Sequence, residues 1–441
     1  MLHILFGIFG LACLVGLALL FSNNKRAVDW TLVLTGIGLQ IAFAVLVLVV
    51  PGGKDVFDAL GHGFVKVLGF VEAGSRFIFG NLMDTGTYGF IFAFQVLPTI
   101  IFFAALMAVM YHLNVMQWIV RVMAAAITKV MRVSGAETTS VCASVFIGQT
   151  EAPLTVRPYI EKMTQSELLT MMIGGMAHIA GGVLAAYVAL LGGGDEAQQV
   201  FYAKHLLAAS IMAAPATLVI AKILIPETGE PLTRGSVKME VEKTSSNIID
   251  AAAGGAADGL KLALNIGAML LAFIALIALI NAPLTWLGDV TGLAGVLGRP
   301  TDLSTLFGYV LAPIAWIIGV PWQDATTVGG LIGQKVVINE FVAYLNLAEI
   351  VNCKTDTMLT NQAVLVATYA LCGFANFSSI AIQIGGIGGL APSRRQDLAR
   401  FGLRAVLGGS IATFMTATIA GVIYVLQVSS ETASALACAA N

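Results

Sequence analysis

The chain has 441 residues, of which 58% are hydrophobic and 11% are charged, and its mean hydropathy is +0.89. A soluble domain carries roughly 25% charged residues, and a soluble surface with so few charges would expose large apolar patches and aggregate. The net charge of −2 offers no basic surface for nucleic acid. The composition therefore excludes a soluble enzyme, a nucleic-acid-binding protein and a disordered scaffold, and it predicts a polytopic protein embedded in membrane lipid.

Uncharged runs of about 20 residues, the length at which a helix crosses a bilayer, recur along the chain. In order, they are residues 2–21, 31–50, 88–111, 168–191, 203–225, 262–281, 357–385 and 404–427. The first run has no basic leading segment and no A-x-A cleavage site, so we expect an uncleaved span and not a signal peptide. Two further apolar runs, about 135–160 and about 303–345, are interrupted, and we expect each to enter the membrane and return as a re-entrant hairpin.

Lysines and arginines near the ends of these runs predict the orientation, because they prefer the cytoplasmic side. They are numerous on one side, as at Arg26, Arg132 and Lys222, and fewer on the other, which includes Lys204 and Lys335. If the first hairpin enters from the cytoplasm and the second from outside, both termini lie on the outer, periplasmic side of the cell inner membrane. The predicted fold is all-α and polytopic, with about eight transmembrane helices, two opposed re-entrant hairpins in inverted repeats, and interfacial helices at 54–80 and 114–133.

Two acidic residues lie inside the interrupted runs: Glu151 in VFIGQTEAPLTV and Glu340 in GGLIGQKVVINEFVAYLNL. An ionisable residue at membrane depth costs about 2.5–3.5 kcal/mol, so it is a candidate functional residue. One interpretation is that each carboxylate sits at an interfacial hairpin tip and pairs with Arg157 or Lys335. We favour a shared polar chamber, because the two carboxylates occur in matching contexts on hairpins of opposite entry.

Each hairpin is followed by a run that is broken in its middle, GGMAHIAGGVLAAY after the first and CGFANFSSIAIQIGGIGGLAP after the second. A hairpin and a broken helix, used twice with inverted entry, is the plan of secondary transporters, which bind substrate near the midplane. The polar residues of these segments include no arginine clamp, so they suit a neutral ligand rich in hydroxyl and amide groups. They are Gln149, Thr150, Glu151, Glu340, Asn376 and Ser379. Phe374 and Phe377 either wall this site or pack within the bundle.

Other functional classes have less support in the sequence. An enzyme needs a nucleophile and base or a metal motif, and the five histidines form no HExxH motif and no zinc spacing with the cysteines. We therefore predict no catalytic residue, and no metal beyond a possible sodium ion. A channel can also carry pore carboxylates, but opposed hairpins favour alternating access. Among carriers, the alternative is one for another neutral polar solute.

The string G-x-K-x3-N-E-F-V-A-Y, from Gly333 to Tyr344, resembles the signature of concentrative nucleoside transporters. GQTEAPLTVRPYI and GFANFSSIAIQIGGIGGLAP resemble the first hairpin and the last broken helix of that family, over roughly residues 30–428 in all. The resemblance implies an ion-coupled symporter that imports a uridine-like nucleoside by alternating access, assembled as a homotrimer. It also implies a division into scaffold (1–113), transport domain (114–225), cytoplasmic connection with a scaffold and trimerisation span (226–302), and transport domain (303–441).

The resemblance also assigns roles to residues. The nucleoside base would face Gln149, Thr150, Glu151 and Val183. The ribose would meet Glu340, Asn376 and Ser379, with Phe374 nearby. The coupling ion would lie near Ser144, Ile147, His178 and Ile179.

Two of the ion-site side chains depart from the sodium-coupled relatives, which carry Asn where this chain has Ser144 and Ser where it has His178. Histidine, with an unperturbed pKa of about 6.5, is suited to taking up a proton. We therefore expect coupling to H+, with Na+ as the close competitor, and no further cofactor.

Overall fold

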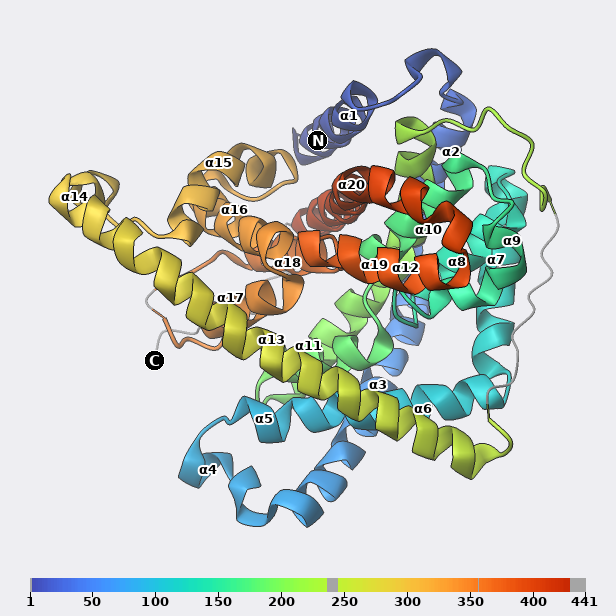
Figure 1. Ribbon diagram of the computed structural model, residues 1–441. Helices are drawn as coiled ribbons and strands as arrows, with labels where there is room; N and C mark the ends of the chain where they lie inside the picture. Colours follow the sequence, from blue (N-terminus) through green and yellow to red (C-terminus); the bar gives the residue numbers. More distant parts are fainter. Residues whose placement is uncertain (1, 236–244, 356, 429–441) are drawn as a thin grey trace.

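The structure is a computed structural model that describes residues 2–235, 245–355 and 357–428. Its regular elements within these residues are all helices (Figure 1). Up to residue 192 they are α1 (Leu2–Leu20), η1 (Lys25–Ala27), α2 (Trp30–Leu48), α3 (Pro51–Phe79), η2 (Gly80–Met83), α4 (Thr85–Tyr88), α5 (Phe92–Gln95), α6 (Leu97–His112), α7 (Val115–Met131), α8 (Gly135–Ser144), η3 (Ala152–Val156), α9 (Arg157–Ile160), α10 (Gln165–Ala177) and α11 (Gly181–Gly192). The later elements are α12 (Glu196–Leu224), α13 (Ile248–Val290), α14 (Leu293–Leu297), α15 (Leu303–Ile317), α16 (Trp322–Val337), α17 (Glu340–Val351), α18 (Asn361–Leu371), α19 (Phe377–Leu390), η4 (Pro392–Arg394) and α20 (Arg395–Val428).

Seven helical segments in the described residues are long and apolar enough to cross a membrane, or eight if the bent pair α15–α16 counts as one span. This confirms the predicted all-α polytopic fold. The largest difference in length concerns α13, which has 43 residues where the apolar run predicted 262–281. The helix starts earlier because the side chain of Asn247 caps it by accepting a hydrogen bond from the amide of Asp250.

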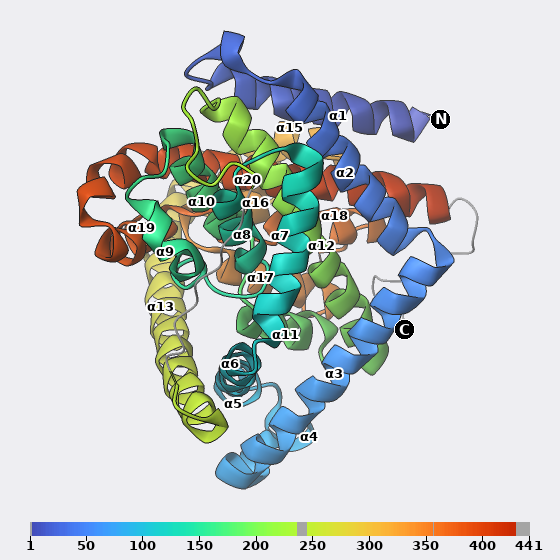
Figure 2. The same ribbon diagram turned by 90° about the vertical axis from the view of Figure 1, so that its right-hand side faces the viewer.

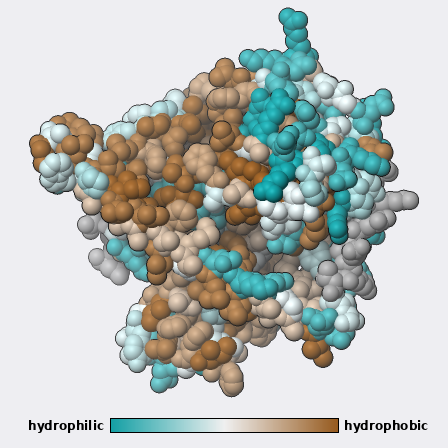
Figure 3. Space-filling model, viewed as in Figure 1, coloured by the Kyte–Doolittle hydropathy of each residue, from teal (hydrophilic) through white to brown (hydrophobic). Residues whose placement is uncertain are grey.

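Burial divides the long helices into an inner and an outer group. In α12 and in the segment that contains α20, 89% of the residues of the apolar window are buried, but in α13 only 11% are. Figures 1 and 2 show α13 as a long helix on the outside of the molecule, next to α6. Its exposed residues include many that are large and apolar, among them Leu264, Leu271, Leu279 and Trp286. Figure 3 shows apolar surface over much of the face on which α13 lies.

The remaining outer helices pack on different neighbours. α1, α2 and α3 contact the buried helix α12, and α1 and α2 also contact α20. α6 contacts α13 and α11. Within residues 1–113, α2 also contacts α3, and α3 contacts α6. The division into scaffold and transport domains stays a prediction.

The two predicted interfacial segments are both helical and amphipathic. In α3 the buried residues follow a helical spacing, from Phe57 and Gly61 to Val65 and Leu68. α7 buries Val120, Ala124 and Ile127 in the same way, while its basic residues are exposed. Each of these helices therefore covers the bundle with one face. Its charged residues are exposed, apart from the half-buried Asp58 of α3, which pairs with Lys204 of α12 at 2.6 Å.

The interrupted runs fold as broken helices. In the first, α8 ends at Ser144 and a turn leads to η3 and α9. In the second, α15 and α16 meet at a bend of 116°, and α16 is separated from α17 by Ile338 and Asn339. The predicted end at about 345 is wrong, because α17 continues to Val351 and buries Leu347 and Ala348 beyond that point.

Lys335 also differs from its prediction. The prediction of membrane orientation placed Lys335 among the basic residues on the outer side of the membrane, but its side chain is fully buried. The reason is a set of specific hydrogen-bond acceptors inside the bundle: Nζ donates to the carbonyl oxygen of Ala370 at 2.7 Å and to Oγ1 of Thr413 at 3.1 Å.

Candidate functional site

Two helix breaks form the frame of the site. α10 ends at Ala177 and α11 starts at Gly181, because His178 and Ala180 adopt extended backbone. α18 ends at Leu371, and α19 starts after the extended residue Asn376, whose Oδ1 caps α19 by accepting from the amide of Ser379 at 2.9 Å. Each break leaves amide and carbonyl groups that the helices cannot pair internally.

The two breaks lie directly against each other. A Cβ atom on Gly373, in the second break, would lie 2.8 Å from the carbonyl oxygen of Met176 and 3.0 Å from the carbonyl carbon of Ala177, at the end of α10 where the first break begins. A Cβ atom on Gly409 of α20 would lie 2.9 Å from Cβ of Met176. Only glycine permits these approaches, so α20 and the two breaks share one closely packed centre.

Glu340 is the buried acidic residue of this centre. It occupies the first turn of α17, after the cap residue Asn339, and the residue is 6% exposed. Its carboxylate accepts hydrogen bonds from the hydroxyl of Tyr187 at 3.1 Å and from Nδ2 of Asn376 at 2.9 Å. The start of a helix favours negative charge, and a carboxylate has about four acceptor positions. Glu340 can therefore accept further hydrogen bonds from a ligand.

A chain of hydrogen bonds joins Glu340 to the first hairpin. Asn376 bonds Glu340 and the amide of Ser379, and Oγ of Ser379 accepts from Nε2 of Gln149 at 3.1 Å. Nε2 of Gln383 in turn donates to Oε1 of Gln149 at 3.2 Å. The structure thus brings together four of the predicted residues from segments far apart in the sequence.

The other four predicted residues lie around this chain in different ways. Thr150 packs on α19, where a Cβ on Gly386 would lie 2.7 Å from its Cγ2. Val183 is buried in the first turn of α11, and Phe374 is half-buried in the second break. Glu151 is exposed and its carboxylate folds back over Gly148. The two acidic residues are therefore not equivalent, since only Glu340 is enclosed.

The predicted ion-site residues come from the end of α8, the following turn and the first break. Oγ of Ser144 donates to the carbonyl of Ser140 at 3.0 Å, and Nδ1 of His178 bonds the carbonyl of Gly174 at 2.7 Å. Ile179 is buried and Ile147 is partly buried. The amide of Gly181 donates to the carbonyl of Phe146 at 3.0 Å, which fastens the turn to the break. In the described residues no group of three or more His, Cys, Asp and Glu side chains is placed to hold a metal ion.

Several residues of the site were not predicted from the sequence. Tyr187, which bonds Glu340 and stacks on Tyr344 at 4.2 Å between ring centroids, is 153 residues before Glu340 and carries no local signal. Gln383 lies one helical turn after Ser379 in a segment that the sequence had singled out. That spacing, which places both side chains on one face of the helix, was the available signal.

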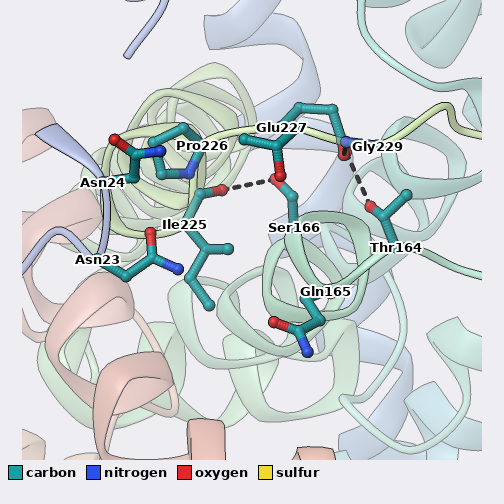
Figure 4. Close-up of a pocket in the computed structure, with 10 residues that line it drawn as sticks. Asn23, Asn24, Thr164, Gln165, Ser166, Ile225, Pro226, Glu227 and Gly229 are labelled. Carbon is teal, nitrogen blue, oxygen red and sulfur yellow. Dashed lines mark hydrogen bonds between the residues drawn. The ribbon is translucent and has the colours of Figure 1, made fainter. Parts of the chain in front are cut away.

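A cavity of about 230 Å³ lies elsewhere, between the loop after α1, the start of α10 and the chain after α12 (Figure 4). Thr164 Oγ1 donates to Glu227 Oε2 at 2.8 Å, and Ser166 Oγ donates to the carbonyl of Ile225 at 2.7 Å. Lys222 bonds Glu137 at 2.8 Å and Glu227 at 3.2 Å. These contacts fasten the connection after α12 to α8 and α10.

A polar site framed by two opposed helix breaks, inside a bundle of long apolar helices, defines a secondary transporter. The family models described as the N-terminus and C-terminus of Na+-dependent nucleoside transporters match residues 9–82 and 205–421, and one described as nucleoside recognition matches residues 93–194. The chain belongs to this family, that of the concentrative nucleoside transporters.

Individual relatives cover nearly the whole chain. An uncharacterized transporter of Haemophilus influenzae is 44% identical over 95% of this chain and 98% of that protein. The nucleoside permease NupC of Helicobacter pylori is 39% identical over 95% of this chain and 97% of that protein. The solved structure of CNTnw in an inward-facing substrate-bound state is 40% identical, with a TM-score of 0.88 over 96% of this chain and 100% of that chain. A CNTnw variant in an outward-facing state gives a TM-score of 0.86 at 41% identity, over 97% of this chain and 99% of that chain.

The family defines the activity. The chain is a multi-pass membrane transporter and not an enzyme. It imports nucleosides, couples this import to an ion, and works by alternating access.

Proposed function

We propose that the substrate is a uridine-like nucleoside and that it binds at the two helix breaks. Its ribose meets Glu340, Asn376 and Ser379, with Phe374 beside it. Its base faces Gln149, Thr150, Glu151 and Val183. The observation that supports this proposal best is the hydrogen-bond chain from Glu340 through Asn376 and Ser379 to Gln149.

The chemistry of this chain suits the two halves of a nucleoside. A buried carboxylate that accepts from two vicinal hydroxyls forms charge-assisted hydrogen bonds, which are about twice as strong as neutral ones. The side-chain amide of Gln149 offers a donor and an acceptor, as do the edges of a base. In the structure this amide bonds Ser379 and Gln383. The base exchanges these bonds for its own, so polar groups stay paired in both states.

We propose a proton as the coupling ion, with His178 as its carrier. Ser144 gives its hydroxyl hydrogen to Ser140 of its own helix, and His178 lies buried at the break that follows the hairpin. One charge moved across about 100 mV contributes roughly 2.3 kcal/mol, which supports about fiftyfold accumulation. Sodium bound by backbone carbonyls at the same place is the competing choice.

We also propose a homotrimer in the cell inner membrane with both termini on the periplasmic side. The support for the assembly is the apolar face of α13. Only 11% of its apolar window is buried in one protomer, so this face lies outside the protomer's core. The support for the orientation is the excess of lysine and arginine on one side of the spans.

Uptake of labelled uridine into proteoliposomes tests the proposal. A pH gradient, acidic outside, should drive concentrative uptake at equal sodium on both sides. Uptake that follows a sodium gradient at fixed pH and does not respond to the pH gradient would show that the proton is not the coupling ion. Saturation and counterflow distinguish the carrier from a channel. If adenosine, free uracil or ribose competes better than uridine and other pyrimidine nucleosides, the uridine-like substrate is wrong.

A further inference from the structure

The end of helix α18 contains an arrangement that the transport of a nucleoside does not by itself require. The last four carbonyls of a helix have no partner within it, and at α18 all four are bonded. Tyr369 and Leu371 accept from the amides of Cys372 and Gly373 in the break itself. Thr368 accepts from the hydroxyl of Tyr344 at 2.6 Å. The fourth, Ala370, accepts from the ammonium of Lys335 at 2.7 Å.

Both hydrogen-bond partners of the Lys335 ammonium accept from it. Oγ1 of Thr413 gives its own hydrogen to the carbonyl of Ser410 at 2.9 Å, so it accepts from Nζ of Lys335 at 3.1 Å. The ring of Phe414 presents its face to Nζ with 5.9 Å between Nζ and the centroid. A carbonyl, a hydroxyl oxygen and an aromatic face form a site for a cation. Among the described residues no carboxylate lies within ion-pair distance of this ammonium.

The position of this cation connects it to the site. Lys335 lies in the last turn of α16, just before the break that precedes Glu340. Thr413 also contacts the second break, where a Cβ on Gly373 would lie 3.0 Å from its Cγ2. Lys335 therefore joins three elements: α16, which leads to Glu340, the end of α18, which leads to Asn376, and α20.

We propose that Lys335 is a built-in cation of the transporter. Its ammonium fills a cation site at the carbonyl end of α18, balances the buried charge of Glu340, and so positions Glu340 and Asn376 for the nucleoside. The first break differs, because no lysine lies at the end of the helix before it. There Nδ1 of His178 bonds the carbonyl of Gly174 near the end of α10. Lys335 is a positioning residue, and this role rests on the proposed nucleoside site.

Chemical rescue tests this role. Lys335→Ala removes the side chain beyond Cβ and leaves a space that propylammonium can fill with the same charge. We expect uridine binding to purified Lys335→Ala to weaken about tenfold or more. Propylammonium chloride should restore most of this loss and raise the temperature of unfolding of the variant, whereas neutral propanol should do neither. If propylammonium changes neither the uridine binding nor the unfolding temperature of Lys335→Ala, Lys335 does not act as a built-in cation.

Two further variants keep the test decisive if Lys335→Ala does not fold. Lys335→Met fills the space without charge, and we expect it to bind uridine weakly with or without propylammonium. Lys335→Arg keeps the charge and should bind more tightly than Lys335→Met. Equal binding by the Met variant and the wild type refutes the role.

A matched control is Lys204→Ala, which removes a lysine that pairs with Asp58 at 2.6 Å outside the site. Its uridine binding should not depend on propylammonium. The rise in unfolding temperature of Lys335→Ala needs no substrate. A wild-type protein that fails to take up uridine would therefore refute the proposed substrate and leave this measurement standing.

Discussion

Glu340→Gln separates the charge of the proposed ribose site from its shape, because glutamine has nearly the same volume as glutamate. The carboxylate accepts from Tyr187 and Asn376, so about two of its four acceptor positions are left for ribose hydroxyls. A hydrogen bond to a charged group contributes about 1.5–3 kcal/mol. Loss of two such bonds weakens binding by about 3–6 kcal/mol, or roughly 10²- to 10⁴-fold in Kd.

The assay compares the binding of uridine, 2′-deoxyuridine and 3′-deoxyuridine to purified wild type and variant by calorimetry. The wild type should prefer uridine to at least one deoxy analogue by about 10- to 100-fold, which corresponds to the loss of one charge-assisted bond. In Glu340→Gln this preference should fall to within about threefold, and uptake into proteoliposomes should be lost. An unchanged thermal unfolding transition is the control for folding. A variant that binds uridine as the wild type does, or that keeps the full preference, refutes the reasoning.

Three further predictions test the frame of the site. Asn376→Asp keeps the helix cap but replaces the donor to Glu340 by a second carboxylate, so helix content measured by circular dichroism should persist while uridine binding is lost. Gly373→Ala places a methyl group 2.8 Å from the carbonyl oxygen of Met176 at the end of α10 and should lower stability by about 1–3 kcal/mol. Gly385→Ala, with open space around its Cβ, should be neutral or slightly stabilising in the same thermal unfolding assay. Lys222→Met leaves the carboxylates of its buried cluster unpaired and should lower stability by about 3–5 kcal/mol. Its counterpart Lys261→Met, in an exposed pair, should change stability by less than about 1 kcal/mol. Equal losses of stability in Gly373→Ala and Gly385→Ala would contradict the close packing of the two breaks. Equal losses in Lys222→Met and Lys261→Met would contradict the role of the buried cluster.

The sequence by itself determined the parts of this protein that depend on local structure. A helix in lipid satisfies its own backbone hydrogen bonds, so about 20 apolar residues suffice to predict a span. Glycine and polar residues inside such a run predict a break. These two rules indicated the long helices, the breaks after Ala177 and Leu371, and the segments that carry Gln149, Glu340 and Asn376.

Only the tertiary structure decided which side chains meet at those breaks. Tyr187 and Glu340 are 153 residues apart, and Gln149 and Ser379 are 230 apart, so no local pattern encodes these pairs. The enclosure of Glu340 and the exposure of Glu151 have the same origin, because two similar motifs acquire different neighbours. Burial of Lys335 depends on acceptors that two other helices supply. Backbone pairing within a helix is local, whereas the partner of a buried polar side chain is fixed by how the helices pack, and the site of this transporter is made of such partners.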